Sequence, residues 1–98
     1  MKGELTTAQK LGYPDHARVL IVNADDFGMC HDENEATIEG LTRGPFTSST
    51  ILVTCPWFEE AADFARNRVG ADLGVHLTLT SEWERYKWGP VLGKKAVP

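Results

Sequence analysis

The chain alternates between apolar segments of strand character and segments of helical periodicity. The first apolar segment, residues 18–28, begins Arg-Val-Leu-Ile-Val and ends in two adjacent carboxylates, Asp25 and Asp26. An apolar run without polar alternation is typical of a strand that is covered on both faces, as in a parallel sheet. We therefore predict a buried parallel strand whose carboxyl end holds the two acids.

A helix is predicted after Gly28, because acidic residues crowd the segment that would form its first turn and suit the positive end of a helix dipole. Gly44 and Pro45 mark the expected end of this helix. Its expected buried stripe consists of Ala36, Ile38, Leu41 and, at the start, Met29.

Residues 46–54 are rich in β-branched residues and predict a second strand, with Cys55 at its carboxyl end. Pro56 is expected as the first residue of a second helix, which Gly70 ends. The buried face of that helix is expected to contain Phe58, Ala61, Ala62, Phe64, Ala65 and Val69.

Residues 72–80 predict a third strand, because apolar and polar positions alternate there. Side chains of one face are aliphatic, and those of the other are glycine, histidine and threonine. This pattern is typical of a barrel strand, with aliphatic residues toward outer helices and polar residues toward the interior. The two sets are Leu73, Val75, Leu77 and Leu79, and Gly74, His76, Thr78 and Thr80.

The order strand-helix-strand-helix-strand predicts an α/β fold of two consecutive βαβ units, with parallel strands and helices outside. Three strands cannot close a barrel, which needs about eight, so we expect an incomplete domain with open sheet edges. Residues 1–17 are polar and predict an N-terminal extension or a short helical turn. Residues 81–98 predict a loop.

Composition narrows the function classes. The 98 residues are 42% hydrophobic and 24% charged, and the net charge of -4 gives no reason to expect nucleic acid or an anionic membrane as a partner. The sequence shows neither the apolar core of a signal peptide nor a membrane-spanning run, so we expect a cytoplasmic protein. Cys30 and Cys55 match no paired-cysteine zinc pattern and are expected to be free thiols.

Asp25 and Asp26 are candidates for chemistry, because ligand sites of α/β sheets and barrels lie beyond the carboxyl ends of the strands. Adjacent negative charges are unfavourable unless a cation neutralises them, and a divalent metal is the simplest such cation. Successive strand side chains point to opposite faces, so we expect one carboxylate at the centre of the site and the other at its rim. The alternative is a turn in which Asp binds nearby backbone donors and caps the helix.

Three motifs resemble, in this order, the YdjC-like carbohydrate deacetylase family, which includes the chitooligosaccharide deacetylases. They are Asn-Ala-Asp-Asp-Phe-Gly at 23–28, Thr-Ser-Ser-Thr at 47–50 and Gly-Val-His-Leu-Thr-Leu-Thr at 74–80. The resemblance implies an irregular (β/α) barrel, of which residues 18–98 would form the N-terminal part. It also implies a metal-dependent hydrolase that removes acetyl groups from N-acetylated sugars or oligosaccharides.

Carried over by position, the resemblance implies Asp26 and His76 as metal ligands and Asp25 as the general base. From the residues alone the two aspartates can exchange roles, and His76 can instead be a buried histidine that is hydrogen-bonded inside the barrel. The family's further ligand and the group that assists the leaving amine, both histidines, would lie beyond residue 98.

The implied cofactor is one divalent ion, magnesium or zinc. Aspartate and histidine together suit zinc, cobalt, manganese or ferrous iron, whereas magnesium prefers an all-oxygen shell.

Aromatic and hydroxyl residues are candidates for substrate contacts. Trp83 and Trp88, with Tyr86 between them, could form a shelf on which sugar rings stack, or could anchor the loop. Residues 48–50 could bind substrate hydroxyls, or could simply suit a strand. His16 and His31 are expected at the surface.

Two other function classes remain open. A receiver-like signalling domain would bind magnesium through the acids after the first strand, but it needs an aspartate after the third strand, where this chain has His76. A non-catalytic remnant or interaction module would pair its open sheet edges with another chain, including a second copy in a homodimer.

Overall fold

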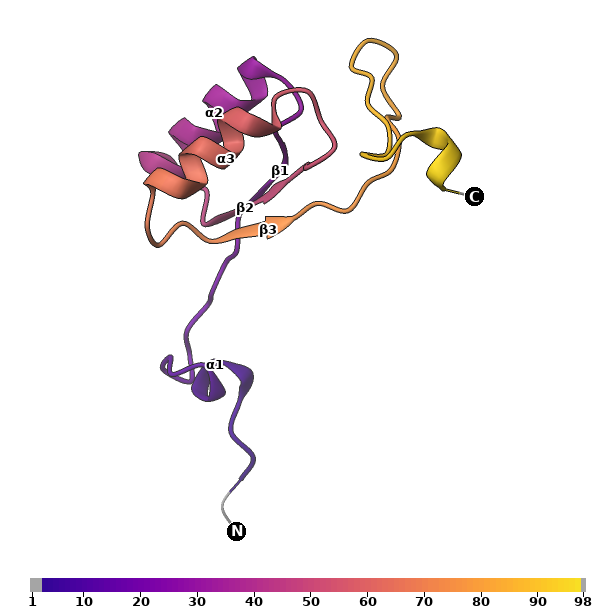
Figure 1. Cartoon of the computed structure of the whole chain (residues 1–98). Helices are drawn as coiled ribbons and strands as arrows, with labels where there is room; N and C mark the ends of the chain where they lie inside the picture. Colours follow the sequence, from indigo (N-terminus) through magenta and orange to yellow (C-terminus); the bar gives the residue numbers. More distant parts are fainter. Residues whose placement is uncertain (1–2, 98) are drawn as a thin grey trace.

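The computed structural model describes residues 3–97 and contains a three-stranded parallel sheet, with its two longer helices on one face (Figure 1). The strands lie in the order β1-β2-β3, with β1 at Asn23–Phe27, β2 at Ser48–Ile51 and β3 at Leu73–Val75. Helix α2, His31–Thr42, connects β1 to β2, and helix α3, Phe58–Asn67, connects β2 to β3. The predicted α/β fold is confirmed, and this sheet does not close into a barrel.

The ends of the chain carry only short elements. Helix α1, Thr7–Lys10, is a single turn in an exposed N-terminal segment that runs away from the sheet, and residues 94–96 form a 3-10 turn (Figure 1). Residues 1–2 and 98, at the outer ends of the segments predicted as 1–17 and 18–98, lie outside the described residues. None of the helices that the structure describes is long and apolar enough to cross a membrane.

The register of the strands gives the sheet one polar face. Ala24 pairs with Ser49 and Ser49 with Leu73, and the buried Ser49 hydroxyl donates to the Ala24 carbonyl at 2.7 Å. Ala24, Ser49 and Leu73 face the helices, so the residues that precede and follow each of them along its strand face away from the helices. The face without helices therefore carries Asn23, Asp25, Ser48, Thr50, Gly74 and His76.

The core lies at the carboxyl ends of the strands. Phe27 is fully buried, and its ring meets the ring of Phe64 edge to face at 5.7 Å between centroids. Met29, Leu52 and Cys55 form a second buried cluster next to it. The ends of β1 and β2 thus rest on packed apolar side chains.

The first strand is shorter than predicted. Residues 18–21 lie outside the sheet, and Leu20 is 77% exposed. Strand pairing begins only where the Val22 carbonyl accepts from the Thr47 backbone N–H at 2.9 Å. The reason is that the chain before Thr47 is held by α2, through a bond from the Phe46 N–H to the Gly40 carbonyl at 3.1 Å, and offers residues 18–21 no neighbouring strand.

The buried side of α2 also differs from the prediction. Asn34, Thr37 and Gly40 are buried, whereas Ala36 is exposed and Ile38 is only partly covered. Gly40 is needed because the Phe46 ring packs so closely that a Cβ atom would lie 2.1 Å from its Cδ2 atom. The end of α2 at Thr42, two residues before Gly44, confirms the predicted stop.

The second helix begins later than predicted, at Phe58. Pro56 belongs to the preceding turn, where the Trp57 N–H donates to the Gly28 carbonyl at 3.0 Å instead of continuing into a helix. Ala61 is buried as expected, but Val69 follows the helix end and is exposed.

The second and third strands are shorter than predicted as well. Strand β2 ends at Ile51, so Cys55 lies in the turn before α3. Strand β3 ends at Val75, and Leu77 is 89% exposed because no helix within residues 3–97 covers that edge of the sheet. The predicted aliphatic face of this strand is therefore largely uncovered.

Candidate active site

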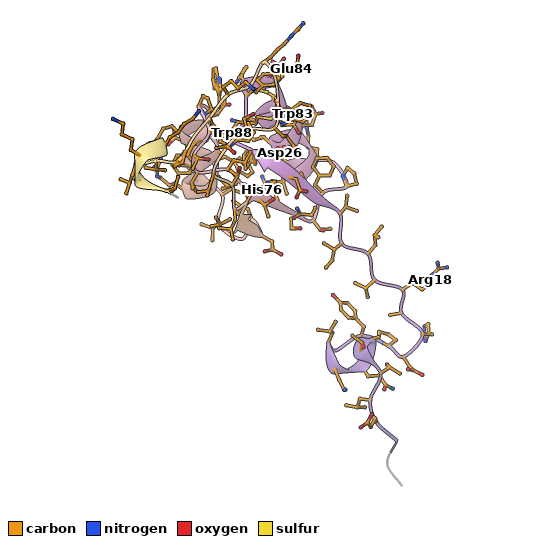
Figure 2. The ribbon with its side chains drawn as sticks, turned by 90° about the vertical axis from the view of Figure 1, so that its right-hand side faces the viewer. Arg18, Asp26, His76, Trp83, Glu84 and Trp88 are labelled. Carbon is orange, nitrogen blue, oxygen red and sulfur yellow. The ribbon has the colours of Figure 1, made fainter. Side chains whose placement is uncertain are left out.

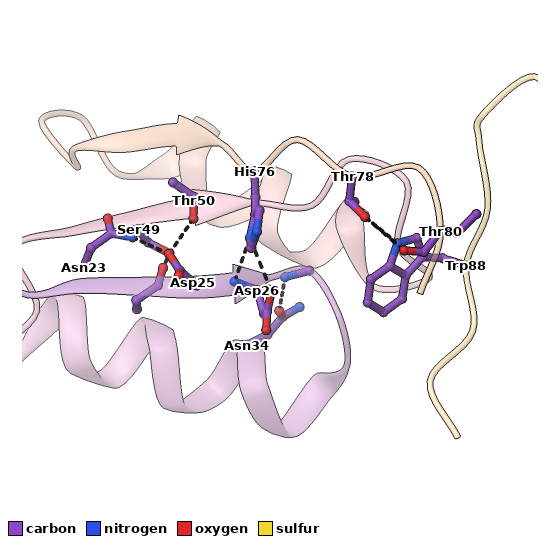
Figure 3. A network of polar contacts seen from close by, with 12 residues as sticks. Asn23, Asp25, Asp26, Asn34, Ser49, Thr50, His76, Thr78, Thr80 and Trp88 are labelled. Atoms are coloured by element: carbon purple, nitrogen blue, oxygen red, sulfur yellow. Dashed lines mark hydrogen bonds and ion pairs between the residues drawn. The ribbon is translucent and has the colours of Figure 1, made fainter. Parts of the chain in front are cut away.

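Asp26 and His76 meet at the carboxyl ends of β1 and β3 (Figure 3). The Nδ1 atom of His76 lies 3.3 Å from the backbone N of Asp26 and 3.3 Å from its Oδ1 atom. The His76 N–H also donates to the Ile51 carbonyl at 2.9 Å, which ties the residue to β2. Two residues 50 positions apart are thus brought into direct contact, each about one-third exposed.

A β-bulge places Asp26 in this contact. The register of β1 against β2 shifts between Ala24 and Phe27, and Asp26 has a left-handed backbone with φ of +63°. Aspartate enters this region more readily than most residues, at a cost of roughly 1–2 kcal/mol. Because the bulge interrupts the alternation of side chains, Asp25 and Asp26 line one cavity instead of pointing to opposite faces.

Asp25 is oriented by its neighbours on two strands. Its Oδ1 atom accepts from Asn23 Nδ2 at 2.6 Å and from Thr50 Oγ1 at 3.1 Å. Asn23 Oδ1 in turn accepts from the Ser48 hydroxyl at 2.7 Å. The hydroxyl residues of β2 therefore support the acid, a role that was not predicted from the sequence.

A cavity of about 360 Å³ opens between the strand ends and the segment that follows β3. It brings Asp25, Asp26 and His76 together with one further carboxylate, Glu82, and with two threonine hydroxyls. Its lining consists of Asp25, Asp26, Leu52, His76, Leu77, Thr78, Thr80, Glu82 and Trp88.

Comparison with known proteins identifies the family of this chain. The model of the family described as YdjC-like protein matches residues 19–98. The chain belongs to the YdjC-like family. Over 80 residues, 81% of the chain, it is 42% identical to a carbohydrate deacetylase of Enterococcus faecalis. It is 36% identical over 63 residues to a chitooligosaccharide deacetylase of Yersinia enterocolitica.

The matches cover only a part of each relative. The segment similar to this YdjC-like chain makes up 29% of the Enterococcus faecalis protein and 25% of the Yersinia enterocolitica protein. The chain thus spans less than a third of the length of the curated relatives that it matches.

The donor atoms at the site are of types that bind divalent cations, but they are fewer than a metal site needs. A carboxylate oxygen and an imidazole nitrogen face each other, with a second carboxylate beside them, a mixed oxygen and nitrogen set that transition metals accept. Within residues 3–97, no three His, Cys, Asp or Glu side chains are arranged to hold a metal ion. The YdjC-like chain therefore assembles two prospective ligands of the three expected for a catalytic site with an open position.

The two tryptophans predicted as substrate contacts lie in different surroundings. Trp88 lines the cavity, packs against the cluster of Met29, Leu52 and Cys55, and donates from Nε1 to Thr78 Oγ1 at 3.2 Å. Trp83 lies outside that lining, in a turn where the Ser81 hydroxyl accepts its N–H at 3.0 Å (Figure 2). Trp88 thus lines the cavity and is anchored by Thr78, and Trp83 is tied to its loop, whereas stacking of a sugar ring on either of them stays a prediction.

Cys55 lies beneath the site and is buried. Burial raises the pKa of its thiol to about 11, and the nearby Asp26 carboxylate adds in the same direction. Without a bound metal, this thiol stays protonated at neutral pH.

The remaining histidines lie away from the cavity. His16 is exposed in the N-terminal segment. His31 begins α2, half-exposed, with Nδ1 2.8 Å from Glu60 Oε1 and its ring tilted against that of Trp57 at 5.1 Å. His31 thus belongs to the contact between α2 and α3.

Proposed function

We propose that this YdjC-like chain carries the front part of a metal-dependent hydrolase that releases acetate from N-acetylated sugars or oligosaccharides. The observation that carries the proposal is the direct contact of Asp26 with His76, with Asp25 in the same cavity. The names of the relatives, carbohydrate deacetylase and chitooligosaccharide deacetylase, support the substrate class.

Asp26 and His76 would hold one divalent ion, zinc or magnesium, and the mixed donor set favours zinc or a similar transition metal. Such an ion, when bound, polarises an acetyl carbonyl and lowers the pKa of water to about 7. Asp25 would act as the general base, because the bonds from Asn23 and Thr50 to its Oδ1 atom fix the carboxylate that receives the proton.

The site needs groups beyond these residues. We infer that a third ligand and the acid that protonates the leaving amine come from the remainder of a YdjC-like barrel, because the matched segment is 29% of the Enterococcus faecalis relative. Trp88, which lines the cavity, would be the aromatic residue that contacts a sugar ring. Cytoplasmic location and a homodimer stay predictions of the sequence.

A chimaera tests the proposal. Residues of this chain replace the matching segment of the Enterococcus faecalis relative, which supplies the rest of the barrel. The chimaera is expected to bind about one divalent ion and to release acetate from an N-acetylated chitooligosaccharide. Asp26→Asn and His76→Ala are each expected to remove both properties, whereas Asp25→Asn is expected to keep the metal and to slow acetate release by about 100-fold or more.

Glu39→Gln is the matched control, since Glu39 is an exposed acid on α2 whose contact is with Arg43, the residue that follows the helix. It should leave metal content and acetate release unchanged. Metal content that survives both Asp26→Asn and His76→Ala would contradict the ligand assignment. A folded chimaera that binds no metal and releases no acetate would favour the non-catalytic alternative.

A further inference from the structure

Asn34, on α2, is fully buried and every polar atom of its side chain has a partner. Its Oδ1 atom accepts from the Gly28 N–H at 2.6 Å. Its Nδ2 atom donates to the Trp57 carbonyl at 3.1 Å and to Glu60 Oε2 at 2.8 Å. A buried polar side chain with a complete set of hydrogen bonds fixes the elements that it connects, here β1, α2 and α3.

These bonds converge on the turn that follows Asp26. Gly28 is held from both sides, because its N–H donates to Asn34 and its carbonyl accepts from the Trp57 N–H at 3.0 Å. The Met29 N–H donates to the Asp26 carbonyl at 3.1 Å and closes the turn. Gly28 has φ of +106°, and a Cβ atom there would lie 3.2 Å from the Leu52 carbonyl oxygen, so the turn has little freedom to shift.

Glu60 determines which way the Asn34 amide points. A carboxylate only accepts hydrogen bonds, so Glu60 Oε2 and the Trp57 carbonyl select the NH₂ end of the amide and leave Oδ1 for the Gly28 N–H. His31 Nδ1 lies 2.8 Å from the other oxygen of Glu60 and holds the carboxylate in place.

We propose that Asn34 is a positioning residue of the candidate site. Its Oδ1 atom anchors the peptide at Gly28, and this anchor keeps Asp26 in its left-handed conformation, with the carboxylate facing His76. Without it, the chain would relax toward a more favourable backbone and Asp26 would leave His76. The consequence for metal binding rests on the proposed function, whereas the effect on the contact between Asp26 and His76 does not.

The test compares Asn34→Leu with Thr37→Ala in the 98-residue chain. Leucine has nearly the shape of asparagine and cannot accept a hydrogen bond, and Thr37 is a buried control one turn further along the same helix. Nuclear Overhauser contacts between the Asp26 amide proton and the His76 ring are expected to disappear in Asn34→Leu. Exchange of the Gly28 amide proton is expected to accelerate by about tenfold or more. Thr37→Ala is expected to lower the melting temperature and to preserve both signals.

A double variant, Asn34→Asp with Glu60→Gln, covers the case in which Asn34→Leu fails to fold. It keeps an acceptor for the Gly28 N–H and reverses the bond to residue 60, because the new amide donates to the new carboxylate. It gives up the bond to the Trp57 carbonyl, so it tests the bond to Gly28 alone. It is expected to retain the contact between Asp26 and His76. Loss of that contact in the folded double variant, or its persistence in folded Asn34→Leu, would overturn the proposal.

Titration of the chimaera with Mn²⁺ adds a measurement, the Mn²⁺ affinity, that would stay unchanged if Asn34 only stabilised the fold. Asn34→Leu is expected to weaken Mn²⁺ affinity by about 10- to 100-fold, and Thr37→Ala to leave it unchanged. Unchanged affinity in Asn34→Leu would count against the proposal. If the unsubstituted chimaera binds no Mn²⁺, the proposed function fails, and the nuclear Overhauser contacts still decide the role of Asn34.

Discussion

Asp25 enters the cavity with its carboxylate already held by residues of β1 and β2. Thr50 Oγ1 donates to Asp25 Oδ1 at 3.1 Å, and Asn23 Nδ2 donates to the same oxygen at 2.6 Å. Hydrogen bonds to a charged oxygen are stronger than those between neutral groups, and they restrict the rotation of the side chain. The orientation of the Asp25 carboxylate therefore depends on Asn23 and Thr50, two residues that do not themselves line the cavity.

Thr50→Val tests this support, because valine keeps the shape of threonine and removes the donor. In the chimaera, kcat for acetate release is expected to fall by about tenfold, since a base that is less well oriented transfers protons less efficiently. The free energy of unfolding is expected to change by about 1 kcal/mol at most. Thr42→Val, at the exposed end of α2, is the control in the same kinetic assay. A rate unaffected by Thr50→Val would show that Asn23 alone orients Asp25.

Cys55 provides a prediction about pH. Burial, reinforced by the Asp26 carboxylate, raises the pKa of the Cys55 thiol to about 11, so the native state retains this proton where the unfolded chain has begun to lose it. The unfolded chain binds fewer protons from about pH 9 upward, and stability therefore falls as the pH rises toward 11. Urea unfolding at pH 8 and pH 10.5 should show a larger loss for the unsubstituted chain than for Cys55→Ala. Cys30→Ala is the control, and an equal loss in all three chains would contradict the prediction.

At the scale of elements, the sequence predicted which segments form strands and helices better than it predicted their buried faces. Alternation at residues 72–80 predicted β3, and the apolar run that begins at Arg18 predicted the first strand, although only its carboxyl-terminal part, Asn23–Phe27, pairs in the sheet. The buried side of α2 was missed, since Asn34, Thr37 and Gly40 are polar or small, and a search for apolar periodicity passes over them. Their spacing of three residues, with acids on the other sides of the helix, is the signal that could have identified them.

Gly40 gives a test of how α2 packs on the segment before β2. An alanine there is expected to destabilise the chain by about 1–3 kcal/mol, although alanine favours a helix, because the new Cβ atom would overlap the Phe46 ring. The midpoint of urea unfolding measures the change. Gly89→Ala is the matched control, because no atom lies within 4 Å of its added Cβ, and it is expected to have little effect. A Gly40→Ala chain as stable as Gly89→Ala would show that the ring moves aside freely.

At the scale of the whole molecule, the sheet has helices on one face and open edges. Val75 at the end of β3, and Leu77 and Leu79 beyond it, are exposed. Val19, Leu20 and Ile21 are exposed before the first strand. Uncovered strand edges next to apolar side chains favour pairing with another chain. Residues 18–21 and 76–80, which the sequence predicted in strands, lie outside the sheet of residues 3–97. The contact between Asp26 and His76 could be predicted because it needs only the order of the strands.

Self-association of the isolated chain is therefore expected to increase with concentration. Light scattering after size exclusion should give an average mass above 10.8 kDa that rises with protein concentration. Leu77→Glu is expected to lower this mass, because it places a charge on the exposed apolar segment, whereas Glu84→Gln serves as a surface control. A constant monomer mass with a sharp thermal transition would contradict this prediction.

Because the backbone of Asp26 is left-handed, part of the free energy needed to arrange the site is spent when the chain folds. An aspartate held at φ of +63° stores strain of roughly 1–2 kcal/mol, and the chain meets that cost once, during folding. A ligand that arrives later finds the acid already turned toward its partner and loses little of its binding free energy to rearrangement. Mutations that let this backbone dihedral angle relax should raise the melting temperature and, at the same time, weaken ligand binding at the site.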